Sequence, residues 1–162
     1  MIRKASVADI PMIQGMAEVV FRQTYASILS PSQMEYMMEW MYSEDSLRKQ
    51  MAEQTFFVED GRGYASLRPD GRTDEGRMRF HLEKLYVMPQ FQRTGLGRRL
   101  FERAAAEARA IAGGACVLEL NVNRNNPSLS FYEHLGMWRA RQGDFPIGGG
   151  YFMNDYIMSI EL

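Results

Sequence analysis

The stretch VMPQFQRTGLGRRL, residues 87–100, constrains the fold of this chain more than any other segment. Residues 80–87, FHLEKLYV, predict a strand, which must stop at Pro89 because proline has no N–H to donate to a sheet ladder. Beyond the turn, apolar residues recur at helical spacing at Leu96, Leu100, Ala104, Ala108 and Ile111. The chain therefore predicts a strand, a glycine-containing turn and an amphipathic helix in direct succession.

The turn QRTGLG has the composition of an anion-binding loop. The N-terminus of a helix offers unpaired N–H groups and the positive end of its dipole, which suits a phosphate. Gly95 and Gly97 would let an anion approach the backbone, and Arg93, Arg98 and Arg99 would supply charge nearby. A Walker loop is excluded because no Lys-Ser or Lys-Thr follows Gly97. A dinucleotide fingerprint is weak because its third glycine is absent, and a plain glycine turn before a helix stays open.

The rest of the chain predicts one domain, residues 1–162, with a mixed α/β organisation. No repeat, low-complexity tract or proline-rich linker divides it. Periodicity, capping residues and turn signals predict helices at about 6–25, 95–112 and 126–136, and one or two helices within 30–53, with Ser30 and Ser43 as candidate caps. They predict strands at about 1–5, 55–59, 64–68, 80–87, 115–123, 137–141 and 151–162. Asp60-Gly61 is a hairpin signal between two of these strands.

Composition narrows the class of protein. The chain is 46% hydrophobic and 24% charged, as in globular proteins, and no apolar run approaches the roughly 20 residues of a membrane span. A net charge of −1 argues against a nucleic-acid binder, although residues 61–110 carry 11 Lys and Arg against 6 Asp and Glu, whereas residues 1–60 carry 5 against 9. A single cysteine, Cys116, and no apolar leader predict the cytoplasm, with no partner nucleic acid or membrane.

Two segments resemble one enzyme superfamily. The string LYVMPQFQRTGLGRRL is similar to the acetyl-CoA-binding segment of the GCN5-related N-acetyltransferases (GNAT), with Gln92, Gly95 and Gly97 at the family spacing. The string NNPSLSFYEHLGM resembles a later family segment, with Asn125 seven residues before Tyr132. Ser128 and Met137 depart conservatively from the usual alanine and phenylalanine.

The resemblance implies a fold and a cosubstrate. The fold class is α/β (α+β), with a central mixed, mostly antiparallel sheet of six or seven strands that is flanked by helices and splayed between its fourth and fifth strands. The cosubstrate is acetyl-CoA, its pyrophosphate on the loop amides and its pantetheine arm on the splayed strand. The implied cofactor-binding residues are Leu85, Tyr86, Val87, Gln92, Arg93, Thr94, Gly95, Leu96, Gly97, Arg98, Asn125 and Tyr132.

Acetyl transfer to an amine needs a group that takes the amine proton and one that protonates the thiolate. Tyr132 matches the family tyrosine near the sulfur, and its alternative is a core tyrosine. Period-two alternation puts Glu83 on the face of Leu85 and Val87, where its carboxylate can act as base; the alternative is a charge on a partly exposed strand. Glu119 and Asn121 are weaker candidates. His81 and His134 have no partner at ligand spacing, so no metal is expected.

The acceptor side of the family is formed by the N-terminal helices and the last strands. Here this region supplies Tyr25, Glu39, Trp40 and Tyr42, aromatic faces beside carboxylates that suit an ammonium group. The segments FRQTYASILS and WMYSEDSLRKQM resemble PaiA-type polyamine acetyltransferases, so a polyamine-like primary amine is expected, acetylated by direct attack.

Two other functions stay open: acetylation of peptides or proteins, and non-catalytic sensing of CoA. The glycine run at residues 148–150 suggests either a lid over the site or a homodimer contact.

Overall fold

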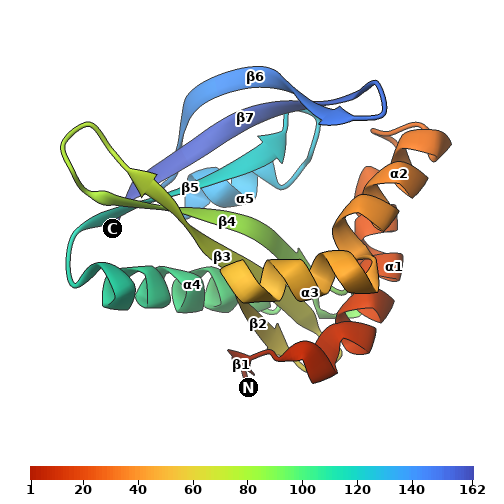
Figure 1. Cartoon of the computed structure of the whole chain (residues 1–162), viewed down its shortest axis with the longest axis horizontal. Helices are drawn as coiled ribbons and strands as arrows, with labels where there is room; N and C mark the ends of the chain where they lie inside the picture. Colours follow the sequence, from red (N-terminus) through yellow and green to blue (C-terminus); the bar gives the residue numbers. More distant parts are fainter.

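The computed structural model describes residues 1–162, and its centre is a seven-stranded sheet (Figure 1). The strands, in the order β1-β2-β3-β4-β5-β7-β6 across the sheet, are β1 Arg3–Lys4, β2 Thr55–Glu59, β3 Gly63–Arg72, β4 Met78–Val87, β5 Cys116–Asn123, β7 Tyr151–Glu161 and β6 Trp138–Gly148. Only the β4–β5 pair is parallel. The expected mixed, mostly antiparallel sheet is therefore confirmed.

The helices lie on both faces of this sheet. They are α1 Ile10–Tyr25, α2 Pro31–Tyr42, α3 Glu44–Glu53, α4 Leu96–Ala112 and α5 Leu129–His134, with short 3-10 turns η1 Val7–Asp9 and η2 Pro89–Phe91. Ser30 and Ser43 cap α2 and α3, since the side-chain oxygen of each accepts a hydrogen bond from the backbone N–H of the third residue of its helix at 3.2 Å. Residues 30–53, expected to form one or two helices with Ser30 and Ser43 as candidate caps, thus form two helices that are separated at Ser43.

Alternating residues of the strands pack into two hydrophobic cores, one on each face of the sheet. Phe56 and Val58 of β2 pack with α1, α2 and α3, whereas Phe57 between them packs with α4, α5 and the far end of the sheet. Because successive strand residues point to opposite faces, each core fixes the helices of its own face. The sheet is buried on both sides where β2, β3 and β4 lie.

The parallel pair β4–β5 is short. Residues Met78 to His81 pair with Cys116 to Glu119, and beyond these the two strands have no further pairing. From Leu82 and Leu120 onward the strands diverge (Figure 1). The splay expected between the fourth and fifth strands is therefore present, and it leaves one edge of β4 without a partner.

The alternation expected for β4 is wrong at Glu83. Leu67 of β3 pairs with Leu82 and Ser66 pairs with Lys84, so Glu83 is an extra residue, a β-bulge. Leu82 and Leu85 both pack into the α4 core, although strict alternation would put them on opposite faces. The bulge therefore removes the simple alternation from which the face of Glu83 was predicted, although Glu83, Leu85 and Val87 all line one cavity.

The C-terminal hairpin is longer than expected from the sequence. β6 and β7 pair from Trp138 to Gly148, and the hairpin tip lies close to α2 (Figure 1). Tyr36 of α2 donates from its hydroxyl to the carbonyl of Ile147 at 2.7 Å. A Cβ on Gly149 would lie 2.9 Å from the Tyr36 ring, and the three glycines all have positive φ. The glycine run makes a turn that packs on α2.

None of the helices has both the length and the apolar composition that a membrane-spanning helix needs.

Candidate active site

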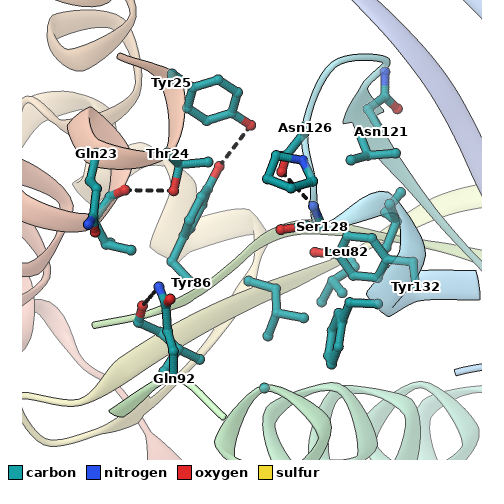
Figure 2. Close-up of a pocket in the computed structure, with 18 of the residues that line it drawn as sticks. Gln23, Thr24, Tyr25, Leu82, Tyr86, Gln92, Asn121, Asn126, Ser128 and Tyr132 are labelled. Carbon is teal, nitrogen blue, oxygen red and sulfur yellow. Dashed lines mark hydrogen bonds between the residues drawn. The ribbon is translucent and has the colours of Figure 1, made fainter. Parts of the chain in front are cut away.

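A cavity of about 580 Å³ opens where β4 and β5 diverge (Figure 2). Its walls come from α1, β4, the loop before α4, β5 and α5. Figure 2 shows the hydroxyls of Tyr25 and Tyr86 pointing toward one another on one side, with Asn126 and Tyr132 on the other. Of the predicted cofactor-binding residues, those that line the cavity are Leu85, Tyr86, Val87, Gln92, Arg93, Gly95, Gly97 and Tyr132.

The loop at one end of this cavity presents free backbone amides. Within residues 93–99, the first backbone N–H that donates to an acceptor in the chain is that of Arg99, which donates to the Gly95 carbonyl at 3.0 Å. The amides of residues 93–98 donate to no acceptor in the chain. Arg93 has φ 63° although it is not glycine, and Gly95 has φ 86°. Consecutive free amides in such conformations form an anion-binding concavity.

The two glycines of the loop have different roles. Gly95 faces open space and needs its positive φ, which residues with a Cβ rarely adopt. Gly97 is helical, and a Cβ there would lie 3.2 Å from Cζ of Phe131 in α5. The interpretation of both as clearing a path for the anion is therefore incomplete, because the missing side chain of Gly97 makes room for an aromatic ring.

Four of the predicted residues around this loop do not line the cavity. Arg98 faces Glu102 on the surface of α4 at 3.8 Å, and Thr94 donates from its hydroxyl to the Phe91 carbonyl. Leu96 is buried in the core, and Arg99 forms an ion pair with Glu59 at 2.9 Å. Arg93 is the arginine that the loop directs at the cavity. The expected cluster of three arginines is thus reduced to one side chain.

Of the asparagine pair after β5, Asn126 lines the cavity and Asn125 does not. Asn125 is exposed and uses its N–H to donate to Oδ1 of Asn123 at 2.9 Å. Asn126 is 7% exposed, lines the cavity, and accepts from the Ser128 N–H at 2.9 Å. Adjacent asparagines in a turn cannot be told apart by spacing alone, so Asn126 was missed.

Tyr132 of α5 is a buried phenol at this cavity. The side chain is 8% exposed and lines the cavity from α5. Burial raises the pKa of its phenol above the ordinary value, with the nearby Tyr25 adding to the shift. The hydroxyl therefore stays protonated at neutral pH and is available as a hydrogen-bond donor.

A second cavity, of about 440 Å³, lies on the side of α2 and α3. Four residues line both cavities: Tyr25, Glu83, Tyr86 and Asn121. The remaining walls include Trp40, Gln50, Lys84, Phe145 and Asp155. The two cavities therefore share a boundary at which a group held in one can reach a group held in the other.

Glu83 stands at this boundary in an ion pair. Its carboxylate accepts from Nε of Arg68, whose Nη1 also donates to Asp70 at 3.0 Å. The side chain of Glu83 is 28% exposed, so it remains accessible from the cavities. His81 lines the second cavity beside it, and burial lowers the pKa of its imidazole.

The four residues predicted for the acceptor separate into two pairs. Tyr25 lines both cavities, with its hydroxyl 3.5 Å from that of Tyr86, and Trp40 lines the second cavity at 48% exposure. Tyr42 is buried in the core and Glu39 is exposed, and neither lines these cavities. Glu119, a weaker candidate, is paired with Arg141 at 2.9 Å.

Two buried charged residues of the second cavity were missed. Lys84 is 4% exposed and Asp155 is 2% exposed. Both residues had the same sequence signal, a charged residue within a strand rich in apolar residues: Lys84 in LEKLYV and Asp155 in YFMNDYIM. No group of three or more His, Cys, Asp or Glu side chains is placed to hold a metal ion.

Comparison with known proteins decides the family. The profile of the Acetyltransferase (GNAT) family matches residues 21–137. The chain belongs to this family. It is a GNAT N-acetyltransferase that uses acetyl-CoA.

Relatives of this acetyltransferase support the same fold. An uncharacterized N-acetyltransferase in the pepI 3′ region of Lactobacillus delbrueckii subsp. lactis is 29% identical over 154 residues, 90% of this chain and 88% of that protein. PaiA N-acetyltransferase from Thermoplasma acidophilum, in complex with coenzyme A, is 22% identical with a TM-score of 0.78, covering 100% of this chain and 98% of that one. The yncA structure from Salmonella typhimurium, with its cofactor acetyl-CoA, is 23% identical with a TM-score of 0.61, covering 100% and 93%.

Proposed function

We propose that this GNAT protein transfers the acetyl group of acetyl-CoA to a primary amine of a small molecule. The observation that carries the proposal is the boundary between two cavities, lined on both sides by Tyr25, Glu83, Tyr86 and Asn121. One cavity ends at free loop amides, and the other is lined near the boundary by the carboxyl groups of Glu83 and Asp155. An acyl donor in the first and an amine in the second would meet at this boundary.

Acetyl-CoA fits the first cavity. The amides of residues 93–98 would bind the pyrophosphate, with Arg93 beside them. The free edge of β4 from Leu82 to Val87 would pair with the amides of the pantetheine arm, as a strand would. Asn126 is the polar side chain that we assign to the same arm in place of Asn125.

The reaction is direct attack of the amine on the thioester. The amine nitrogen forms a bond to the carbonyl carbon, and the bond from that carbon to sulfur breaks. The thiolate takes the phenol proton of Tyr132, while the proton lost by nitrogen passes to Glu83, directly or through a water. Proton exchange with solvent restores both groups. The products are the acetylated amine and free CoA.

No covalent enzyme intermediate is needed. Cys116, the one thiol of the chain, is fully buried at the far end of β5. Burial raises the pKa of this thiol, which keeps it protonated and unreactive. Direct attack accordingly remains the mechanism that the side chains support.

The second cavity favours a small molecule over a peptide, because helices α1, α2 and α3 and the β6–β7 hairpin all contribute to its walls. Polyamines were the first class expected from the sequence. Two of the four residues behind that expectation, Tyr25 and Trp40, do line the cavity, whereas Glu39 and Tyr42 do not. We therefore propose the broader class of small primary amines, with polyamines as one arm of the test.

CoA release measured across polyamines, amino acids, aminoglycosides and short peptides tests this proposal. We expect turnover with at least one class of small amine, and none with peptides longer than the cavity admits. Turnover with peptides alone would favour protein acetylation. Tight binding of acetyl-CoA without turnover of any amine would contradict the proposed function.

A further inference from the structure

Lys84 is a buried cation that lines the second cavity, which we call the acceptor cavity. This lysine forms no ion pair. Its ammonium donates to Oε1 of Gln50 on α3 and has no carboxylate within ion-pair distance. It lies over the rings of Phe56 and Tyr42, at 5.5 and 5.8 Å from their centroids. Burial lowers the pKa of this amine to about 8, and the charge of the Glu83 carboxylate offsets only part of that effect. A neutral amide and two rings compensate poorly for the lost hydration of an ammonium group.

Asp155, in the same cavity, is a buried carboxyl group with one oxygen that lacks a hydrogen-bond donor. Its Oδ2 accepts from Nδ2 of Asn121 at 3.2 Å, but its buried Oδ1 has no hydrogen-bond partner. Burial raises the pKa of this carboxyl group. A buried oxygen without a donor is costly, and such groups in native proteins usually have a function or a missing partner.

The two residues lie at different parts of the cavity. Asp155 is bonded to Asn121, which belongs to the boundary with the acetyl-CoA cavity. Lys84 lines only the acceptor cavity and is bonded to Gln50 of α3, away from that boundary. A ligand that spans them would place its amine near the thioester and its other end toward α3.

From this arrangement we infer that the acceptor carries an anionic group as well as the amine, with the amine at Asp155 and Glu83 and the anion at Lys84. A carboxylate at Lys84 would supply the missing counter-charge, and an ammonium at Asp155 would donate to the free oxygen. The substrate class is therefore an amino acid or a similar small zwitterion. This inference rests on the proposed function and narrows it.

A simple polyamine fits these charges less well. Its second ammonium group would approach Lys84, and like charges in a poorly hydrated cavity repel strongly. Arg68 and His81 line the same cavity, and Arg68 is already neutralised by Glu83 and Asp70. Lys84 is thus the basic group whose charge the ligand itself must balance.

Matched substrate pairs test the inference. Lysine and cadaverine, ornithine and putrescine, and phenylalanine and phenethylamine each differ by one carboxylate. We expect kcat/KM at least about tenfold higher for the carboxylate-bearing member of the preferred pair, the range for one buried charge pair. Equal values, or a preference for the decarboxylated members, would overturn the inference while leaving the proposed function intact. If no amine is acetylated, the proposed function itself fails.

The variant Lys84→Gln tests whether Lys84 causes the preference for the carboxylate-bearing substrate. We expect KM for the carboxylate-bearing substrate to rise about tenfold or more, whereas KM for its diamine partner should fall, because the repulsion between Lys84 and the second ammonium group is removed. Lys49→Gln is the control, because Lys49 is an exposed residue of α3. Stabilisation of the unreacted protein by the carboxylate-bearing amine, followed as a rise in Tm, should disappear in Lys84→Gln only. An unchanged KM and an unchanged Tm rise in Lys84→Gln would overturn the assignment.

Discussion

The hydroxyl groups of Tyr42 and Tyr64 lie 2.7 Å apart in the core between α2 and the sheet. Tyr42 is 3% exposed and Tyr64 is fully buried, so water cannot replace this bond. Burial raises the pKa of both phenols well above the ordinary value, and both stay neutral. The residue that the sequence assigned to the acceptor is here half of a buried polar pair.

Tyr42→Phe should therefore destabilise the fold and leave catalysis intact. The Tyr64 hydroxyl would lose its partner, which costs about 1–3 kcal/mol of unfolding free energy. Denaturant unfolding measures this loss, and KM for the amine should be unchanged. In the double variant Tyr42→Phe/Tyr64→Phe the loss should be smaller than the sum of the single losses. A raised KM at full stability would return Tyr42 to the acceptor site.

Gly97→Ala should weaken acetyl-CoA binding through Phe131. The new Cβ would lie 3.2 Å from the ring, closer than a relaxed contact, so α4 or α5 must shift at the free amides. We expect the Kd for acetyl-CoA, measured by calorimetry, to rise several-fold. Adding Phe131→Leu should recover most of the affinity.

Gly15→Ala is the matched control for this variant. Gly15 lies inside α1, and a Cβ there would meet nothing within 4 Å. Alanine is a better helix former than glycine by about 1 kcal/mol, so this variant should be slightly more stable with unchanged affinity. If Gly97→Ala bound acetyl-CoA like the control, the packing role of Gly97 would be wrong.

Tyr132→Phe should lower kcat without changing the Kd for acetyl-CoA. The ring would remain in place between α5 and the cavity, and only the proton donor would be lost. General acid catalysis contributes typically 10²–10⁴-fold, so we expect a loss of at least about 10²-fold in kcat. An unaltered rate would exclude Tyr132 as the acid.

Glu83→Gln should lower the rate mainly at pH values below the pKa of the substrate amine. There the amine must lose a proton before it attacks, whereas at higher pH it is already neutral. Rate profiles of both proteins between pH 6 and pH 10 should therefore converge toward the alkaline end. A deficit of equal size at every pH would mean that Glu83 positions Arg68 and does not take a proton.

The sequence predicted the elements that depend on local pattern. Helix α4 begins after Gly95, and it ends before Gly113 because this glycine adopts the left-handed conformation that caps the C-terminus of a helix. The splayed pair and the loop amides followed from the resemblance of two motifs. What the sequence did not predict depends on register and direction. The bulge at Glu83, the choice of Asn126 over Asn125, and the turn of Arg99 toward Glu59 each require a neighbour distant in sequence.

The buried charges were missed for a related reason. A lysine within LEKLYV looks like an exposed residue of a half-buried strand, because alternation is the only local guide. The bulge turns Lys84 into the cavity, where Oε1 of Gln50 in α3 accepts a hydrogen bond from its ammonium group. Neither the bulge nor the partner is encoded near residue 84, so the acceptor site emerges only from the assembled fold.

Lys84→Met should raise the stability of the protein at neutral pH and lose that advantage as the pH rises. The pKa of Lys84 falls from 10.5 to about 8 on folding, so the folded state holds this proton less tightly than the unfolded chain. Below about pH 8 both states are charged, and the full cost of burying the charge is present, up to about 3 kcal/mol. Between pH 8 and 10.5 only the unfolded chain keeps the proton, so the stability of the wild-type protein gains with pH relative to the variant.

Denaturant unfolding of both proteins at pH 7 and pH 9.5 measures the difference, in which the other titrating groups cancel. A difference that stays constant between the two pH values would show that Lys84 is not desolvated in the folded protein, and it would remove the physical basis for an anion at this position.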